Sequence, residues 1–239
     1  MIKKAMIFAA GLGTRFKPWT DLHPKALAIV NGKSLLQRNI EYLQQYGINE
    51  IVINVHHFAE QIIKAVSENN GWGSKIIFSD ESDLLLETGG GLLHAKKYLE
   101  GERFVTLNVD FLTNLNLNKI FEFHERSKTL ITIAVTKRKS SRYFLFDENE
   151  YLCGWKNTIT KEEIISFPCI SPSEKAYSCV AIYEPEIFDN IYQKGKFSIT
   201  ETFLSLAKNK LVKGLDHTGD LLIDVGKPES VKIAESLFV

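Results

Sequence analysis

The sequence predicts an α/β fold with a Rossmann-like, mostly parallel central sheet, helices on both faces and a small β-hairpin insertion. Two observations predict it. Short apolar, β-branched runs alternate with segments of helical spacing through the first half of the chain, and glycine or polar residues directly follow several of these runs. An alternating order of strand and helix favours parallel strands that are joined by crossover helices.

The first half of the chain carries most of the expected sheet. The expected strands are the apolar or β-branched runs at residues 5–9, 50–55, 75–78, 103–107 and 130–135. The expected helices, identified by the spacing of their apolar residues, cover residues 35–46, 58–66, 91–99 and 117–124. Ser34 is a typical N-cap for the first of these helices, and Gly47 is a typical stop signal.

The second half begins with a different pattern. Residues 143–146 and 151–155 are rich in aromatic residues and flank the acidic segment 147–150, which predicts the hairpin. Further strands are expected at residues 176–183 and 221–225, and helices at 198–208 and after Pro228.

Length and composition limit the classes of function. The 239 residues suit one domain, 1–239, as a monomer or a small homo-oligomer. Lys and Arg together number 29, as do Asp and Glu, which argues against nucleic acid as the main partner. The apolar runs are far shorter than the ~20 residues of a membrane span, so we expect no membrane partner.

The cysteines predict the redox environment. Cys153, Cys169 and Cys179 are an odd, sparse set without metal-ligand spacing. We therefore expect reduced thiols and a cytoplasmic protein.

The most informative segment follows the first expected strand. Residues 9–15 read Ala-Ala-Gly-Leu-Gly-Thr-Arg, and Lys25 lies ten residues further on. Glycines at the end of a strand allow a tight turn with exposed backbone N–H groups, which bind phosphate. Arg15 and Lys25 add cationic donors that suit phosphate oxygens. The segment lacks the Gly-Lys-Ser/Thr of a Walker A loop and the third glycine of a dinucleotide fingerprint, where Phe16 stands.

Two aspartates also follow expected strands. Asp110 ends the segment Asn-Val-Asp at 108–110, and Asp224 begins Asp-Val-Gly. Taken singly, each side chain is typical of a cap on the following turn. Because ligands of parallel sheets bind beyond the carboxyl ends of the strands, both carboxylates are also placed to share one crevice with Arg15 and Lys25.

A glycine cluster precedes the helix expected at 91–99. Residues 87–91 read Glu-Thr-Gly-Gly-Gly, and three glycines in succession allow a close approach of the backbone to a flat ligand. Glu87 or Thr88 is then placed to contact a base edge or a sugar hydroxyl. The alternative is a flexible loop that leads into the helix.

Together these motifs resemble a known family. Gly11, Gly13, Thr14 and Arg15, then Pro18 and Thr20, then Pro24-Lys25 and Leu27 match GxGTRxxPxT followed by PKxL. This composite resembles the signature of the sugar-1-phosphate nucleotidyltransferases. The Glu-Thr-Gly-Gly-Gly segment is similar to the subgroup that includes N-acetylmuramic acid 1-phosphate uridylyltransferases, with relatives that use GTP and mannose or heptose 1-phosphates.

The resemblance implies a fold, a reaction and roles. It implies a GT-A-like nucleotidyltransferase fold, with a nucleotide-binding half at about 1–115 and a sugar-phosphate half at about 116–239. A nucleoside triphosphate and a sugar 1-phosphate would give a nucleotide sugar and pyrophosphate. The implied catalytic residues are Arg15, Lys25, Asp110 and Asp224, of which Asp110 and Asp224 would hold Mg²⁺. The implied nucleotide-binding residues are Ala10, Gly11, Gly13, Thr14, Arg15, Glu87, Thr88 and Gly89. The implied sugar-phosphate-binding residues are Asn108, Lys156 and Cys179.

The sequence departs from the family pattern at two positions and leaves alternatives open. Val109 and Cys179 stand where the family usually has glycine, so the acceptor is less defined than the reaction. Besides UTP or GTP transfer to a sugar 1-phosphate, the alternatives are a glycosyltransferase, a silent regulatory subunit, or a choline phosphate cytidylyltransferase with an aromatic box of Tyr143, Trp155 and Tyr177. We also expect a stand-alone transferase, without the C-terminal β-helix acyltransferase of some larger relatives.

Overall fold

The structure is a computed structural model that describes residues 2–238. A ten-stranded sheet runs in the order β11-β10-β9-β12-β6-β1-β4-β5, with β8 paired to β12 and β13 paired to β8. Its strands are β1 (Lys4–Phe8), β4 (Glu50–Val55), β5 (Lys75–Asp80), β6 (Phe104–Asn108), β8 (Ile131–Thr136), β9 (Arg142–Phe146), β10 (Leu152–Asn157), β11 (Glu163–Ile165), β12 (Ser173–Tyr183) and β13 (Val212–Asp216). Two small sheets pair β2 (Ile29–Val30) with β3 (Lys33–Ser34), and β7 (Phe111–Thr113) with β14 (Leu222–Asp224).

The helices connect and cover these strands. They are α1 (Leu35–Gln44), α2 (Ala59–Glu68), α3 (Glu87–His94), α4 (Lys96–Leu99), α5 (Leu117–Ser127), α6 (Ile199–Ala207) and α7 (Glu229–Leu237). Ser34 caps α1 as predicted, because its hydroxyl accepts a hydrogen bond from Gln37 N. Among residues 2–238, no helix combines the length and apolar character needed to cross a membrane.

The strands of the first half form the expected parallel sheet. β5, β4, β1 and β6 lie side by side and parallel, with Ile7 opposite Ile53 on one side and Leu107 on the other. β12 then pairs antiparallel with β6, and β8 with β12, so the complete sheet is mixed. The predicted α/β, Rossmann-like class is confirmed.

Both faces of the sheet are buried. Along β1, Ala5 and Ile7 belong to a core that includes apolar residues of α1, α2 and α5. Met6 and Phe8 point the other way, into a core with α3, α4 and α6. A strand that is covered on both faces needs apolar residues at every position, which explains the unbroken apolar run in the sequence.

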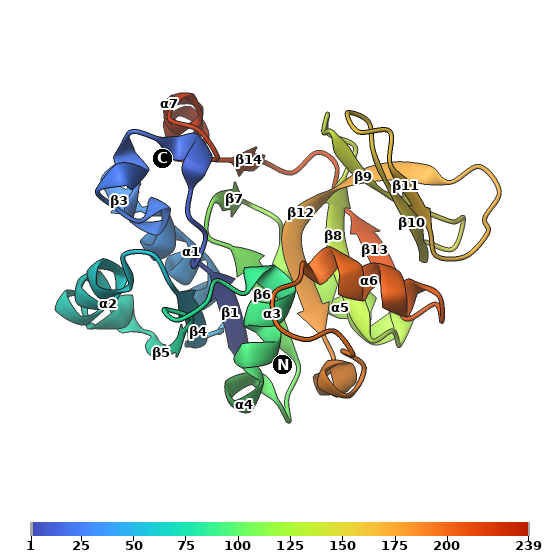
Figure 1. The fold of residues 1–239 in the computed structure, drawn as a ribbon, viewed down its shortest axis with the longest axis horizontal. Coiled ribbons are helices and arrows are strands. Elements are labelled where there is room, and N and C mark those ends of the chain that lie inside the picture. Colours follow the sequence, from blue (N-terminus) through green and yellow to red (C-terminus); the bar gives the residue numbers. More distant parts are fainter. Residues whose placement is uncertain (1, 239) are drawn as a thin grey trace.

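The predicted hairpin forms, but it is not a separate insertion. β9 and β10 pair antiparallel, and β9 also pairs with the start of β12, where Ser173 lies opposite Phe146. The hairpin therefore extends the central sheet. With β11 it lies at the end of the molecule away from α2 and β5 (Figure 1).

The glycine cluster is helical rather than a loop. We expected a helix only from residue 91, but α3 begins at Glu87 and contains all three glycines. A Cβ at Gly89 would lie 2.4 Å from the Phe197 ring, and one at Gly90 would lie 2.2 Å from Gly195 O. The close packing of α3 on segment 195–199 therefore needs these glycines and outweighs their low helix propensity.

The expectation of three reduced cysteines is wrong for two of them. Cys153 in β10 and Cys169 after β11 form a disulfide, while Cys179 is free. β11 runs antiparallel along β10, back toward Cys153, and the Cα atoms of the two cysteines lie 6.6 Å apart. Sequence separation alone does not show this return, and the thiol argument for a reducing compartment no longer applies.

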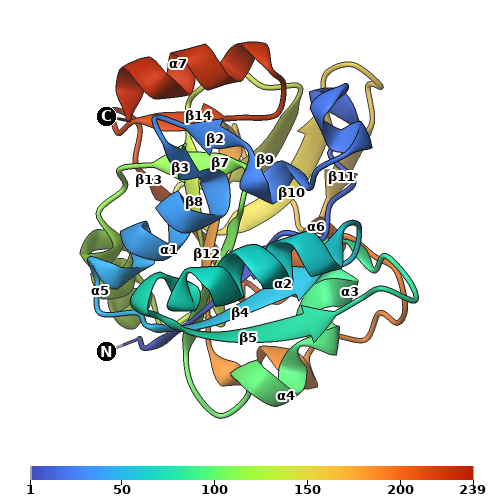
Figure 2. The ribbon, with the colours of Figure 1, turned by 90° about the vertical axis from the view of Figure 1, so that its left-hand side faces the viewer.

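The end of the described chain packs back onto its beginning. Helix α7 lies over the small sheet of β7 and β14, next to β2 and β3 (Figure 2). Asn31 Nδ2 donates hydrogen bonds to Glu235 O and Phe238 O, at 2.7 and 3.1 Å. These contacts hold the end of α7, the helix that follows β14, against the first half of the chain.

The buried side chain of His124, in α5, predicts that the stability of the protein depends on pH. His124 Nδ1 lies 2.8 Å from Thr132 Oγ1, and burial lowers the pKa of His124. The unfolded chain then binds this proton more readily, so stability decreases as the pH falls below about 6.5, by up to about 1.4 kcal/mol per pH unit.

Denaturant unfolding at pH 7.5 and 5.5 measures this contribution. The wild-type chain should lose more stability between the two pH values than His124→Gln, which cannot take up the proton. Equal losses in both proteins would contradict the assignment.

Candidate active site

A cavity of about 360 Å³ opens at the carboxyl ends of β1 and β6, where the fold predicts ligand binding. Its lining gathers residues that are far apart in the sequence, from Phe8 to Gly226. They are Phe8, Ala9, Ala10, Gly11, Gly13, Thr14, Arg15, Lys25, Asn54, Glu81, Leu85, Glu87, Thr88, Asn108, Val109, Asp110 and Gly226.

The turn after β1 depends on one of its two glycines. Gly13 has a left-handed backbone with φ 60°, and a Cβ there would lie 2.9 Å from Thr20 and 3.1 Å from Lys25. Thr20 Oγ1 also donates a hydrogen bond to Gly13 O at 2.9 Å. A Cβ at Gly11 would meet no such neighbour within 4 Å. Packing therefore requires glycine at position 13. Packing does not require glycine at position 11, where the glycine leaves the backbone open to the cavity.

The two aspartates lie side by side although they are far apart in sequence. β7 and β14 pair antiparallel with Asp224 opposite Phe111, and Val225 N donates a hydrogen bond to Asp110 O at 2.8 Å. Because β7 directly follows Asp110, this pairing places Asp224 next to Asp110, which lines the cavity.

Each aspartate meets a cation from the segment after β1. Lys25 Nζ lies 2.5 Å from Asp110 Oδ2, and an Arg15 guanidinium nitrogen lies 3.6 Å from Asp224 Oδ2. Lys25 is 8% exposed, so its charge is largely removed from water and depends on this partner. The structure thus brings together all four side chains that the sequence analysis selected for catalysis.

The acidic pair has the chemistry of a divalent-cation site. Asp224 Oδ1 is buried and has no hydrogen-bond partner within the described chain. Two carboxylates with a free oxygen suit a hard cation such as Mg²⁺. Within residues 2–238, no three His, Cys, Asp or Glu side chains gather as a metal site. A cation held here would therefore take its remaining ligands from water or from a substrate.

Gly226 holds this arrangement and was missed by the sequence analysis. A Cβ at position 226 would lie 2.6 Å from Asp224 Oδ1 and 2.9 Å from Arg15 Nη2. Gly226→Ala must therefore displace one of these two side chains. We expect turnover to fall by about 100-fold, because small displacements at a reacting centre are costly. A steady-state assay and a melting curve on the same sample test this, and unchanged turnover would contradict it.

A second cavity, of about 550 Å³, adjoins the first and shares Arg15, Thr88 and Asn108 with it. Asp224 and Cys179 line it together with residues of the hairpin. Burial raises the pKa of the Cys179 thiol, and the nearby negative charge of Asp110 raises it further. The adjoining cavities give space for two ligands on either side of the acidic pair.

Two further residues of the second cavity bear on the alternatives. Trp155 and Tyr177 line it, but Tyr143 does not. The Tyr143 hydroxyl accepts a hydrogen bond from Ser140 N at 2.8 Å. Lys156 lines neither cavity and pairs with Glu174. The structure therefore does not gather the proposed aromatic box, and it places Lys156 away from both cavities.

The first three residues of α3 have different positions relative to the two cavities. Glu87 lines the first cavity and lies 3.8 Å from Lys196 Nζ. Thr88 lines both cavities, and its hydroxyl accepts a hydrogen bond from Ile199 N at 3.0 Å. Gly89 instead faces the Phe197 ring.

A buried polar pair supports the first cavity and was not found from the sequence. Asn54 Oδ1 accepts hydrogen bonds from Ala9 N and Ala10 N at 2.7 and 3.3 Å. Its amide donates to Glu81 Oε1 at 2.7 Å, and burial raises the pKa of Glu81. The pair fixes the chain where β1 leads into the glycine turn. In the sequence, this pair could have been recognised from Asn54, because an asparagine is unusual within an otherwise apolar strand.

Comparisons with known proteins agree with this geometry. The family model "Nucleotidyl transferase" matches residues 4–236. An N-acetylmuramate alpha-1-phosphate uridylyltransferase of Caulobacter vibrioides is 44% identical over 98% of this chain and 96% of its own. An N-acetylmuramate alpha-1-phosphate uridylyltransferase of Neisseria meningitidis serogroup B is 30% identical over 98% of this chain and 97% of its own.

Guanylyltransferases and solved structures extend the comparison. The mannose-1-phosphate guanylyltransferase catalytic subunit beta of Drosophila melanogaster is 30% identical over 99% of this chain but only 63% of its own. The crystal structure of HddC from Yersinia pseudotuberculosis complexed with GMP-PN has a TM-score of 0.77 and 25% identity, and covers both chains fully. The match across almost the whole chain confirms the resemblance predicted from the sequence motifs: the chain belongs to the nucleotidyl transferase family, that of the sugar-1-phosphate nucleotidyltransferases.

Proposed function

We propose that the protein joins UTP to an N-acetylmuramic acid 1-phosphate-like sugar, giving the UDP-sugar and pyrophosphate. The single observation that carries the reaction type is the joint position of Arg15, Lys25, Asp110 and Asp224 at the junction of two cavities. The choice of substrates is supported by the two uridylyltransferases, which match the chain over nearly their whole length.

The first cavity binds the triphosphate in this proposal. Gly11, Gly13 and Thr14 hold the phosphates through backbone N–H groups. Arg15 takes the β- and γ-phosphates, and Lys25 offsets charge near the α-phosphate. Residues 1–115 would thus supply most of the nucleotide-binding half, with Ala10, Glu87 and Thr88 near the base and ribose.

The second cavity binds the sugar 1-phosphate, on the side of residues 116–239. Asn108 and Cys179 line it and are proposed to contact the sugar phosphate. Val109 and Cys179 carry side chains where the family usually has glycine. Cys179 lines the second cavity, so we expect it to limit the shape of the acceptor, whereas Val109 lines the first cavity.

The reaction is an in-line displacement at the α-phosphorus. An oxygen of the sugar phosphate forms the new bond to the α-phosphorus, and the bond from this phosphorus to the bridging oxygen of the β-phosphate breaks. Pyrophosphate leaves with that oxygen and its electron pair. The attacking phosphate is already ionised near pH 7, so no side chain has to remove a proton. Positioning and charge neutralisation supply most of the catalysis.

Mg²⁺ is the proposed cofactor, and Asp110 and Asp224 are the residues that would hold it. When bound, it would supply charge neutralisation between the two phosphate groups. The free oxygen of Asp224 and the oxygen-only donor set are the observations that fit the ion. Lys25 and Arg15 orient the two carboxylates through their ion pairs.

A GTP-dependent transfer to mannose or heptose 1-phosphate is the second candidate. It is supported by the guanylyltransferase relatives and by the structural neighbour that was crystallised with GMP-PN. The chain spans less than two thirds of those guanylyltransferases, whereas it spans nearly all of the uridylyltransferases. The uridylyltransferase function is therefore preferred.

A pyrophosphate-release assay with Mg²⁺ tests the proposal. Four triphosphates (UTP, GTP, CTP and dTTP) are each combined with N-acetylmuramic acid, glucose and mannose 1-phosphates and with choline phosphate. We expect the fastest release with UTP and N-acetylmuramic acid 1-phosphate. Faster release with GTP and mannose 1-phosphate would favour the second candidate. Sugar transfer from a nucleotide sugar, without pyrophosphate, or nucleotide binding without turnover would contradict both.

A further inference from the structure

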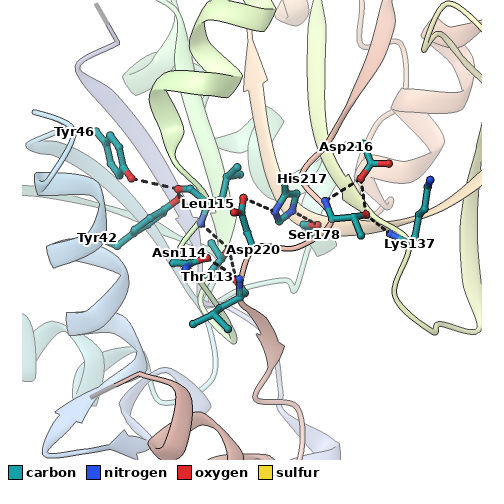
Figure 3. Close-up of polar contacts among 12 residues, drawn as sticks. Tyr42, Tyr46, Thr113, Asn114, Leu115, Lys137, Ser178, Asp216, His217 and Asp220 are labelled. Carbon is teal, nitrogen blue, oxygen red and sulfur yellow. Dashed lines mark hydrogen bonds and ion pairs between the residues drawn. The ribbon is translucent and has the colours of Figure 1, made fainter.

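Three side chains outside both cavities form a short polar chain. Ser178 Oγ lies 2.7 Å from His217 Nε2, and His217 Nδ1 lies 3.4 Å from Asp220 Oδ2 (Figure 3). Serine, histidine and aspartate in this order are familiar from nucleophilic catalysis. Ser178, however, is fully buried and lines neither cavity, so its hydroxyl cannot meet a substrate. These three side chains must therefore have a role other than nucleophilic catalysis.

The hydrogen-bond roles in this chain follow from burial. His217 is 7% exposed, and burial lowers the pKa of its ring, which favours the neutral form. A neutral imidazole has one donor and one acceptor nitrogen. With the Nδ1 hydrogen facing the Asp220 carboxylate, Nε2 accepts the hydrogen bond that Ser178 donates.

Ser178 belongs to a bulge in β12. Tyr177 lies opposite Val135 and Ala181 lies opposite Ile133, so four positions of β12 advance while β8 advances by two. Cys179, inside the bulge, has a left-handed backbone with φ 59°. Such a backbone is unfavourable for a residue with a Cβ, and it persists only where surrounding contacts hold it. The Ser178–His217 hydrogen bond is such a contact.

The bulge forms part of the wall of the second cavity. Cys179 lines that cavity, one residue from the buried hydroxyl of Ser178. The conformation of the bulge therefore decides which atoms of position 179 face the acceptor. A change in the Ser178 hydrogen bond should reach the cavity through this single peptide unit.

The other end of the polar chain is anchored beside the acidic pair. His217 N donates to Val135 O at 3.0 Å, and Leu221 N donates to Asn114 Oδ1 at 2.7 Å. Thr113 Oγ1 donates to Leu221 O at 2.8 Å. Segment 216–221 is thus fixed between β8 and β7 directly before β14, the strand that carries Asp224 (Figure 3).

We propose that Ser178, His217 and Asp220 are positioning residues for the acceptor: they hold the β12 bulge in one conformation, at a fixed place relative to the strand that carries Asp224. The nature of the acceptor rests on the proposed function above. The conformational role rests only on the contacts of the bulge.

Ser178→Ala and His217→Ala test the positioning role in the assay. Each should raise the KM for the sugar 1-phosphate by about tenfold, because a buried partner is left without its hydrogen bond. The KM for the triphosphate should not change, since the turn at Gly11–Arg15 makes no contact with the polar chain. His217→Gln keeps a polar group near the Nε2 position, so it should recover part of the acceptor affinity.

His124→Gln is the matched control. His124 is also a buried histidine, with a hydroxyl partner in Thr132 and a carboxylate neighbour in Glu184 at 3.4 Å, but it lies at the opposite end of the sheet. It should lower stability and leave both KM values unchanged. If Ser178→Ala raised both KM values equally, or lowered stability and left both KM values unchanged like this control, the role would be structural only and the proposal would be overturned.

A second readout needs no turnover. Iodoacetamide labelling, followed by mass spectrometry of the peptide that contains Cys179, reports on the bulge directly. In Ser178→Ala we expect labelling about tenfold faster than in the wild type, because the bulge opens more often. Absence of transferase activity in the wild type would overturn the proposed function and leave this measurement valid. Unchanged labelling in Ser178→Ala would overturn the positioning role, whatever the assay shows.

Discussion

Asp224→Asn is expected to lower turnover by about 100- to 1,000-fold, because removing one charged ligand of a catalytic cation costs several kcal/mol of transition-state stabilisation. The exchange keeps the size of the side chain and changes only its charge and one donor atom. Asp224 is held by β14, whose pairing with β7 uses backbone groups only. The fold should therefore tolerate the change, and the Arg15 contact at 3.6 Å contributes little to stability.

The measurement is kcat for pyrophosphate release over a range of Mg²⁺ concentrations, with a melting curve on each sample. Asp80→Asn is the matched control: Asp80 also ends a parallel strand, is exposed and lines neither cavity. The control should keep full activity. Unchanged turnover in Asp224→Asn, at any Mg²⁺ concentration, would remove Asp224 from the site.

Lys25→Met should reduce both activity and stability. Its side chain is 8% exposed, and its ammonium group lies 2.5 Å from Asp110 Oδ2. Without it, the Asp110 carboxylate is left partly buried and unpaired, which should cost about 1 to 3 kcal/mol of folding free energy. The charge near the α-phosphate is lost as well, so we expect kcat/KM to fall by about 100-fold or more.

Lys175→Met provides the matched control for Lys25. Lys175 is equally exposed, at 8%, and lies 3.4 Å from Asp216 Oδ2, but it lines neither cavity. Urea unfolding and steady-state kinetics of both variants separate the two effects. We expect both to lose stability and only Lys25→Met to lose activity. Equal activity in the two variants would contradict the role of Lys25.

Local patterns were sufficient for the parts of the fold that depend on neighbouring residues. The apolar run at 5–9, the Ser34 cap and the alternation of strands and helices all appear where the sequence predicts them. The turn after β1 was also predictable, because glycines and cations lie within a short stretch of chain.

Features that depend on contacts between distant segments were not predictable in this way. Gly89 and Gly90 were expected before the helix, either close to a ligand or in a loop, but they lie within α3 and serve its packing against residues 195–199. The Cys153–Cys169 pair depends on the course of β11, which short sequence patterns did not indicate. Asn54 and Glu81 act through a hydrogen bond that joins β4 to the residue after β5.

For the acidic pair of Asp110 and Asp224, one part of the arrangement was predictable from local sequence and another part was not. Asp110 and Asp224 were each visible as an aspartate after a strand, yet their adjacency depends on the pairing of β7 with β14. The residue pattern placed both aspartates at strand ends, and the resemblance to a family indicated that they would hold an ion together. The position of Gly226 between Asp224 and Arg15 follows from the same pairing and could be recognised only in three dimensions.

Crystals grown with Mn²⁺ and a non-hydrolysable UTP analogue would test the central claim most directly. We expect one anomalous peak within coordination distance of both Asp110 and Asp224, with the triphosphate along the turn at Gly11–Arg15. An ion that contacts neither carboxylate, or a nucleotide bound away from that turn, would contradict the proposed site.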